Sequence, residues 1–174
     1  MILERVFHKK ANLEAVYLLG DFGVRVTGRS AVITEPVKNL EFGDWTTQGL
    51  PFYGGNVTYH LEMEEFESDA VLEISKFRAP LLSVRLNGEE RGILAFSPYQ
   101  LKLKNQKREK GHLEITAFGN RINTFGALHN SDLSDNKADP NYWRTKGCAW
   151  SYEYCLRKSG ILKSPVIKII EEKK

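Results

Sequence analysis

The sequence predicts an all-β protein, a sandwich or a barrel, from three observations. Segments rich in β-branched and aromatic residues recur with turn signals about every 8–12 residues, as in sandwiches and barrels. One segment, Val57–Glu64, alternates strictly between apolar and polar side chains, which is the period of a strand with one buried face. We find no amphipathic helix of even three turns with its 3.6-residue apolar stripe.

The length and composition set the broad class. With 174 residues, 41% of them hydrophobic, the chain can build the core of one domain, and wholesale disorder is not expected. Its 25 basic and 22 acidic residues give a net charge of only +3, so we predict no nucleic-acid partner. No run approaches the roughly 18 apolar residues of a membrane helix, so we predict no membrane partner.

The first strands are expected near the N-terminus. Glu14–Leu19 is apolar and β-prone, and it stops at a Gly-Asp turn. Val24–Thr27 and Ala31–Thr34 flank a turn that contains Gly28, a pattern that predicts a hairpin. The segment from Pro36 to Trp45 reads as an irregular loop.

The central strands carry the clearest signals. In the alternating segment Val57, Tyr59, Leu61 and Met63 are expected to face the core, and Thr58, His60, Glu62 and Glu64 to face solvent. Val71–Ile74 is a further short strand. Leu82–Leu86 leads into Asn87-Gly88, the strongest two-residue hairpin signal, and Gly92–Phe96 is the returning arm.

The last strands are less regular. We expect Leu101–Leu103 and Leu113–Phe118 to pair with each other across the basic run LKLKNQKREKGH, which reads as a solvated loop tip. Ala149–Leu156 and Val166–Ile170 complete a set of about ten strands.

A glycine-rich aromatic bend precedes the alternating strand. Gly54 and Gly55 allow the backbone to pass beside large rings where a β-carbon would obstruct it. We predict that Pro51 and Phe52, like Tyr59, pack in the core. Tyr53 is the ring that we expect to look outward.

Three motifs in a fixed order resemble a known family. GDWTTQGLPFYGGNVTYHLEM, VRLNGEERGILAFSPYQLKL and LEITAFGNRINTFGALHN are similar to the galactose-binding-like jelly-roll domain of glycoside hydrolases. The likeness is to the sugar-binding domain of family 2 enzymes and to accessory domains of large bacterial glycosidases. It covers about Gly43–Asn130, with an extension through WRTKGCAWSYEYCLRKSGIL, and it implies a jelly-roll β-sandwich.

The resemblance also implies a domain organisation and a function. Residues 41–174 would form the sandwich, and residues 1–40 would be an N-terminal arm or the tail of a preceding domain. The expected function is that of a non-catalytic carbohydrate-binding module, with the catalytic domain of its parent enzyme as a second partner. The alternative is a scaffold that packs on the catalytic domain through the N-terminal arm and binds no sugar.

An independent hydrolase is the least favoured function. Glycosidases need two carboxylates that face each other across the sugar. The acidic residues Glu62, Glu64, Glu65 and Glu67 instead follow the solvent face of one predicted strand. The chain also lacks the motifs of nucleophile elbows, zinc proteases and phosphate loops, so we predict no catalytic residue.

Six residues are candidates for contact with a sugar: Trp45, Tyr53, Arg121, Asn123, His129 and Trp143. Loop aromatics would stack on the apolar face of a pyranose, while Arg, Asn and His side chains would bind its hydroxyls. For Trp45 and Trp143 burial as loop anchors is the other interpretation. For His129 the other interpretation is a turn-stabilising role.

Metals and cofactors have little support. The four histidines are scattered without metal-ligand spacing, and we predict no cofactor. The loop Asn130–Asn141, with Asp132, Asp135 and Asp139, either holds a structural calcium or is simply rich in turn-forming residues, since its spacing fails the EF-hand rule.

Two further features concern redox state and processing. Cys148 and Cys155 are expected to be two reduced, buried thiols, although one bridge is possible. The start MILERVFHKK lacks the apolar region of a signal peptide, and we expect the chain to be a fragment of a longer bacterial protein whose location stays open.

Overall fold

The computed structural model of the chain describes residues 4, 6, 9, 16–64, 68–104, 111–132, 143 and 145–170. Their regular secondary structure is almost entirely β, and the fold class predicted from the sequence, an all-β sandwich, is confirmed. The elements are β1 Gly23–Thr27, β2 Ser30–Thr34, the 3-10 helix η1 Trp45–Thr47, β3 Val57–Met63, β4 Ala70–Glu73, β5 Phe77–Arg78, β6 Leu82–Leu86, β7 Glu89–Leu94, β8 Gln100–Leu103, β9 Gly111–Ala117, α1 Ile122–Phe125, β10 Gly160–Ile161 and β11 Val166–Ile169.

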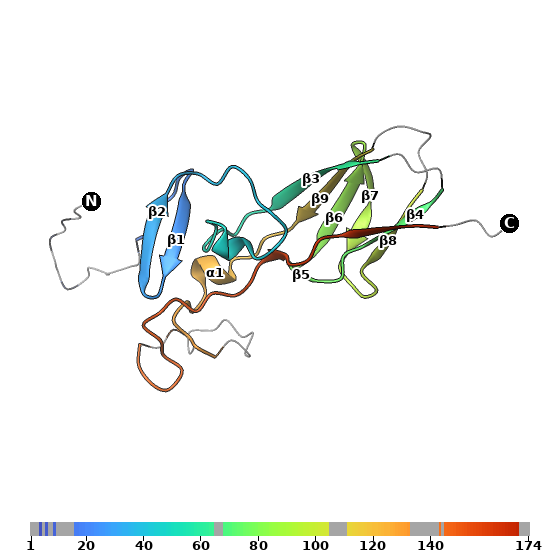
Figure 1. The fold of residues 1–174 in the computed structure, drawn as a ribbon. Helices are drawn as coiled ribbons and strands as arrows, with labels where there is room; N and C mark the ends of the chain where they lie inside the picture. The colour runs from blue at the N-terminus through green and yellow to red at the C-terminus, as the bar shows by residue number, and fades with distance from the viewer. Residues whose placement is uncertain are drawn as a thin grey trace.

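Two antiparallel sheets form the sandwich. One has four strands in the order β3-β9-β6-β7, and the other has three in the order β11-β4-β8. Two smaller pairs complete the topology: β10 with β5, and the hairpin β1-β2. In Figure 1 that hairpin lies at the opposite end of the molecule from the two main sheets, with α1 between them.

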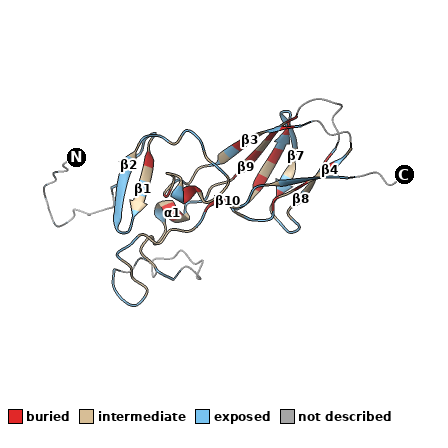
Figure 2. Ribbon diagram, viewed as in Figure 1, coloured by how far each residue is buried: buried red, intermediate tan, exposed pale blue. Residues whose placement is uncertain are grey.

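The core lies between the two main sheets. β9 alternates strictly between buried and partly buried residues, and β4 and β6 bury every second side chain. Leu72 from the three-stranded sheet and Leu113 and Ile115 from the four-stranded sheet are fully buried in one continuous cluster. Figure 2 shows the buried positions gathered on these strands and the exposed ones on β2. The predicted inward face of β3 is confirmed, because Tyr59 and Met63 are 6% and 7% exposed.

The Asn87-Gly88 hairpin forms as predicted. Both residues have positive φ, 52° and 79°, as a type I′ turn requires, and they join β6 to β7. Four residues after Gly88, Gly92 has a φ of 147° opposite a register shift between Val84 and Arg85. A β-carbon at Gly92 would lie 2.9 Å from a methyl group of Leu101, so glycine here allows close approach to the other sheet.

The hairpin predicted around Gly28 is also confirmed. β1 and β2 pair in register from Gly23 opposite Thr34 to Thr27 opposite Ser30. Outside its own ladder, the Val24 amide donates to the Gly49 carbonyl at 2.8 Å, which ties the hairpin to the bend that precedes β3.

Hydrogen bonds connect the segment around η1 to the distant residues Ser159 and Ile161. The Gly43 amide donates to the Ile161 carbonyl at 2.7 Å, and the Trp45 amide donates to the Ser159 carbonyl at 3.0 Å. Asp44 caps η1, and one of its carboxylate oxygens accepts from the Thr46 amide at 3.0 Å. The same oxygen accepts from the Ser159 amide at 3.2 Å, so a single side chain holds both segments.

Two predicted strands are wrong. Residues 16–19 are irregular and exposed, while residues 14 and 15 lie outside the described part of the chain. Ala149–Leu156 forms only an isolated bridge between Trp150 and Asn130. Its backbone bonds instead with a nearby loop, since the Ser151 amide donates to the His129 carbonyl at 2.8 Å. Its aromatic residues therefore pack in a loop cluster rather than on a sheet face.

The predicted pairing across the basic run is wrong as well. β8 pairs with β4, and β9 pairs with β3 and β6, so the run connects the two sheets of the sandwich. The expected loop tip falls on residues 105–110, which lie outside the described residues. Strands that are consecutive in the chain can therefore belong to different sheets, and a strand's paired neighbour need not follow it in the chain.

Two smaller expectations concern helices and thiols. Within the described ranges, no helix has both the length and the apolar character needed to cross a membrane. Both cysteines are free, as expected, but neither is buried: Cys148 is exposed and Cys155 is partly exposed.

Candidate functional site

The glycine-rich bend before β3 separates a buried side from an exposed side. Pro51 is fully buried, as expected, whereas Phe52, also expected in the core, is only partly buried and packs against Tyr154 with ring centroids 5.4 Å apart. Tyr53 is 43% exposed and donates its hydroxyl to the Asn56 carbonyl at 3.1 Å. A β-carbon at Gly55 would lie 2.5 Å from that hydroxyl. The glycine therefore makes room for the ring that sequence reasoning expected to face outward.

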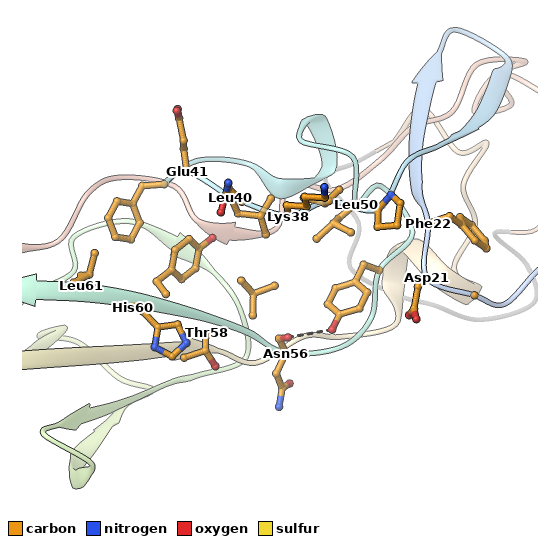
Figure 3. A pocket seen from close by; sticks show the side chains of 18 residues that line it. Asp21, Phe22, Lys38, Leu40, Glu41, Leu50, Asn56, Thr58, His60 and Leu61 are labelled. Carbon is orange, nitrogen blue, oxygen red and sulfur yellow. Dashed lines mark hydrogen bonds between the residues drawn. The ribbon is translucent and has the colours of Figure 1, made fainter.

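Tyr53 lines a groove of 880 Å³ beside the free edge of β3, here called the β3 groove. Its walls come from the segment after β2 on one side and from β3 on the other, as Figure 3 shows. The lining residues are Gly20, Asp21, Phe22, Pro36, Val37, Lys38, Asn39, Leu40, Glu41, Phe42, Leu50, Tyr53, Asn56, Val57, Thr58, Tyr59, His60 and Leu61.

The β3 groove has an apolar floor and a polar rim. Phe42 stacks on the buried Tyr59, with ring centroids 4.9 Å apart and planes inclined by 21°. Burial raises the pKa of the Tyr59 hydroxyl, and the nearby backbone of Ile161 acts in the opposite direction. The rim residues Asp21 and Lys38 are exposed and carry opposite charges. Such a lining offers apolar contact and hydrogen bonds to one ligand.

Two of the six candidate residues are buried and serve the fold. Trp45 is 2% exposed, with its ring edge toward Tyr53 at a centroid distance of 6.4 Å, so the expected exposed platform is corrected to a loop anchor. Asn123 is 4% exposed. Its side chain donates to the Arg157 carbonyl at 2.7 Å and accepts from the Arg157 amide at 2.9 Å, which ties α1 to the C-terminal segment.

Three other candidates lie outside the β3 groove. Arg121 is exposed, and its guanidinium lies 5.8 Å from the Phe125 ring centroid. The His129 ring packs on Trp150 and Tyr154, and its Nδ1 donates to the carbonyls of residues 151 and 153 at 3.1 and 3.2 Å. These bonds fit the turn-stabilising interpretation of His129. Trp143 is 60% exposed and lines a separate hollow with residues 145–147.

The structure thus does not bring the six candidates into one site. Tyr53 alone of them lines the β3 groove. Arg121 lies behind the same bend, with its Cγ 3.4 Å from where a β-carbon at Gly54 would stand.

The sequence reasoning missed the polar groove residues Asn56, Thr58 and His60. The strand alternation correctly placed Thr58 and His60 on the solvent face. It gave no sign that the segment after β2 lies beside them and forms the other side of a groove. The expectation that the histidines are scattered is wrong for one pair, because His60 Nδ1 and His112 Nε2 lie 3.1 Å apart. The two interpretations of Asn130–Asn141, a structural calcium or a loop rich in turn-forming residues, both stay predictions, since residues 133–142 lie outside the described part of the chain.

Comparison with known proteins gives structural neighbours only. No protein-family model matches the chain, and no curated protein matches it. Among solved structures, the chain is similar to a GH2 beta-galacturonidase from Eisenbergiella tayi bound to galacturonate, with 22% identity, a TM-score of 0.47 and 87% of this chain covered. It is also similar to a rhamnosidase from Novosphingobium sp. PP1Y, with 18% identity, a TM-score of 0.48 and 94% of this chain covered.

The chain spans only a small part of these structures. The match covers 23% of the beta-galacturonidase chain and 16% of the rhamnosidase chain.

Proposed function

We propose that this chain is a non-catalytic carbohydrate-binding module of a larger glycoside hydrolase and that it binds its ligand in the β3 groove. The observation that carries the proposal is the exposed ring of Tyr53 in the lining of a groove with an apolar floor and a polar rim. The three ordered motifs described above, which resemble a galactose-binding-like domain, support the same class of ligand.

The lining suits the two kinds of surface on a sugar. A pyranose offers C–H faces that pack on aromatic rings and a ring of hydroxyls that hydrogen-bond to polar side chains. Tyr53 is held in place by its bond to the Asn56 carbonyl and by its contact with Trp45, so its ring is ordered before the ligand arrives. With so few contacts, we expect a millimolar dissociation constant, which corresponds to a binding free energy of about −4 kcal/mol.

Calorimetric titration tests the proposal. The panel contains neutral and acidic galactosides, glucosides and rhamnosides, added to the 174-residue chain. We expect saturable binding of at least one of these sugars, and Tyr53→Ala weakens it at least tenfold, which corresponds to about 1.4 kcal/mol. The matched control is Tyr152→Ala, because Tyr152 is 73% exposed and does not line the β3 groove.

Three results would count against the proposal. Sugar binding that is unchanged in Tyr53→Ala would mean that the ligand binds outside the β3 groove. No heat of binding for any sugar of the panel would mean that the chain does not bind these carbohydrates. Turnover of nitrophenyl glycosides by the isolated chain would contradict a non-catalytic role.

A scaffold role is the second candidate, and exposed apolar residues favour it. β11 lies at the edge of the three-stranded sheet, and Val166 and Ile169 on it are 44% and 52% exposed. In the N-terminal segment Leu18 and Leu19 are 54% and 93% exposed. Apolar surface of this kind, on a strand edge and on an irregular segment, suits contact with a neighbouring domain.

The scaffold role predicts a different set of measurements. The chain would bind none of the sugars and would form a complex with the separately produced catalytic domain of its parent. Replacement of Leu19 and Ile169 by lysine would weaken that complex at least tenfold, whereas Tyr53→Ala would leave it unchanged.

A further inference from the structure

The outer face of the four-stranded sheet carries two polar cross-strand pairs that share one ladder. In the antiparallel register of β3 and β9, His60 stands opposite Glu114, and Glu62 stands opposite His112. Directly opposite side chains on one face of a sheet are near neighbours, and diagonal ones are within reach of long side chains. Both histidines are therefore presented to the same point, with a carboxylate beside each.

The donor atoms converge to a distance that suits a metal ion. His60 Nδ1 lies 3.1 Å from His112 Nε2 and 3.6 Å from Glu114 Oε1. The third side of this triangle, from His112 Nε2 to Glu114 Oε1, measures 3.9 Å. A tetrahedral zinc ion with bonds of about 2.0–2.1 Å holds its donors roughly 3.3 Å apart, so small side-chain adjustments bring all three donors to one ion.

A fourth residue orients one of the ligands. Glu62 Oε1 lies 3.0 Å from His112 Nδ1, so the carboxylate accepts the proton of that nitrogen and leaves the lone pair of Nε2 directed at the other donors. Metal-binding histidines in proteins commonly have this carboxylate partner on their second ring nitrogen. The Glu62 contact is therefore the arrangement that a metal ligand requires.

The surrounding charges and exposure are compatible with a cation. Glu114 Oε2, the oxygen that turns away from the histidines, is 3.8 Å from Arg85 Nη1. Arg85 is itself held by a bond of 2.7 Å from Nη2 to the Gly88 carbonyl, so its contact with Oε2 orients the Glu114 carboxylate with Oε1 on the side of the histidines. The side chains of His60 and His112 are 57% and 41% exposed, which gives a hydrated ion access and leaves room for water as a further ligand.

We propose that His60, His112 and Glu114 form a binding site for a divalent transition-metal ion, Zn²⁺ being the best fit to two imidazoles and one carboxylate. Glu62 acts as a positioning residue for His112. The site lies on the solvent face of the sheet and shares His60 with the lining of the β3 groove. Its test uses Zn²⁺ alone, so the outcome does not depend on whether the groove binds a sugar.

Calorimetric titration of the tag-free chain with Zn²⁺ alone tests the proposal. We expect saturable binding of one equivalent and a rise in melting temperature, because the ion joins β3 to β9 only in the folded state. His60→Ala and His112→Ala each weaken binding at least tenfold. Glu62→Ala weakens it about 10–100-fold through the loss of orientation, as is usual for the partner of a ligating histidine.

His129→Ala is the matched control, because that histidine lies in the loop cluster and not on this sheet face. It leaves the affinity for Zn²⁺ unchanged. The four alanine variants change exposed or partly exposed side chains, and a thermal melt without metal verifies that each is folded. The proposal is overturned if Zn²⁺ shows no saturable binding, or if His60→Ala and His112→Ala bind it as tightly as the unaltered chain.

Discussion

Removal of the Asp44 side chain should break the hydrogen bonds that connect η1 to the segment around Ser159. Asp44 Oδ1 accepts from the Thr46 amide at 3.0 Å, from the Thr46 hydroxyl at 2.8 Å and from the Ser159 amide at 3.2 Å. Thr46 and Ser159 are 8% and 5% exposed, so water cannot easily replace the lost acceptor. In Asp44→Ala these donors lose a partner while they stay buried.

The cost of Asp44→Ala follows from two contributions. Loss of a helix-capping side chain costs about 1 kcal/mol. Each buried donor left without an acceptor costs about 1–3 kcal/mol, and the Ser159 amide is the one that no rearrangement of η1 can serve. We therefore expect Asp44→Ala to lower the free energy of unfolding by about 2–4 kcal/mol.

Urea unfolding followed by tryptophan fluorescence measures this change, because Trp45 lies next to the altered residue and is 2% exposed. Asp44→Asn is the matched control, since its side-chain oxygen can still accept from the same donors, and it should cost about 1 kcal/mol or less. The reasoning is refuted if Asp44→Ala lies within about 0.5 kcal/mol of the unaltered chain, a range typical of neutral surface changes. It is also refuted if Asp44→Asn is as costly as Asp44→Ala.

Three further predictions concern other parts of the fold. In Gly55→Ala the new β-carbon would lie 2.5 Å from the Tyr53 hydroxyl, so the ring must move. We expect the free energy of unfolding to fall by about 1–2 kcal/mol, and thermal or denaturant melts should show that this cost disappears in a Tyr53→Ala background. Because burial raises the pKa of Tyr59, stability should be full below pH about 10 and fall as the pH rises through the folded pKa; Tyr59→Phe should remove this alkaline loss in denaturant melts. The 2.6 Å bond from Lys168 lowers the pKa of the partly exposed Glu73. An NMR titration of Lys168→Ala should therefore show that pKa move up toward its ordinary value, and an unchanged pKa would contradict the assignment.

The candidate site shows where reasoning from the sequence succeeds and where it stops. The Gly54–Gly55 pair was expected to let the backbone pass beside large rings, and Tyr53 was expected to look outward. Both features involve residues adjacent in the chain, so local geometry decides them. Trp45 could not be assigned in the same way. Its burial depends on Gly160 and Ser159, which are more than a hundred positions away in the chain.

The aromatic segment around Trp150 is a case where a clear local pattern led to a wrong prediction. Its alternating aromatic residues predict a strand, yet Tyr152 is 73% exposed and the backbone of Ser151 bonds with a loop. β-propensity describes fitness for a half-buried pleated surface, and no such surface lies beside this segment.

The sequence alone determined the all-β class, the facing of β3 and the Asn87-Gly88 hairpin. Each of these depends on residues within a few positions of one another, because strand period and turn dihedrals are local properties. Tertiary structure alone decided which strands pair, where the β3 groove opens and that His60 meets His112 across 52 positions of chain. The reason is that periodicity fixes which face a side chain occupies, while its neighbour on that face is selected by packing between distant segments.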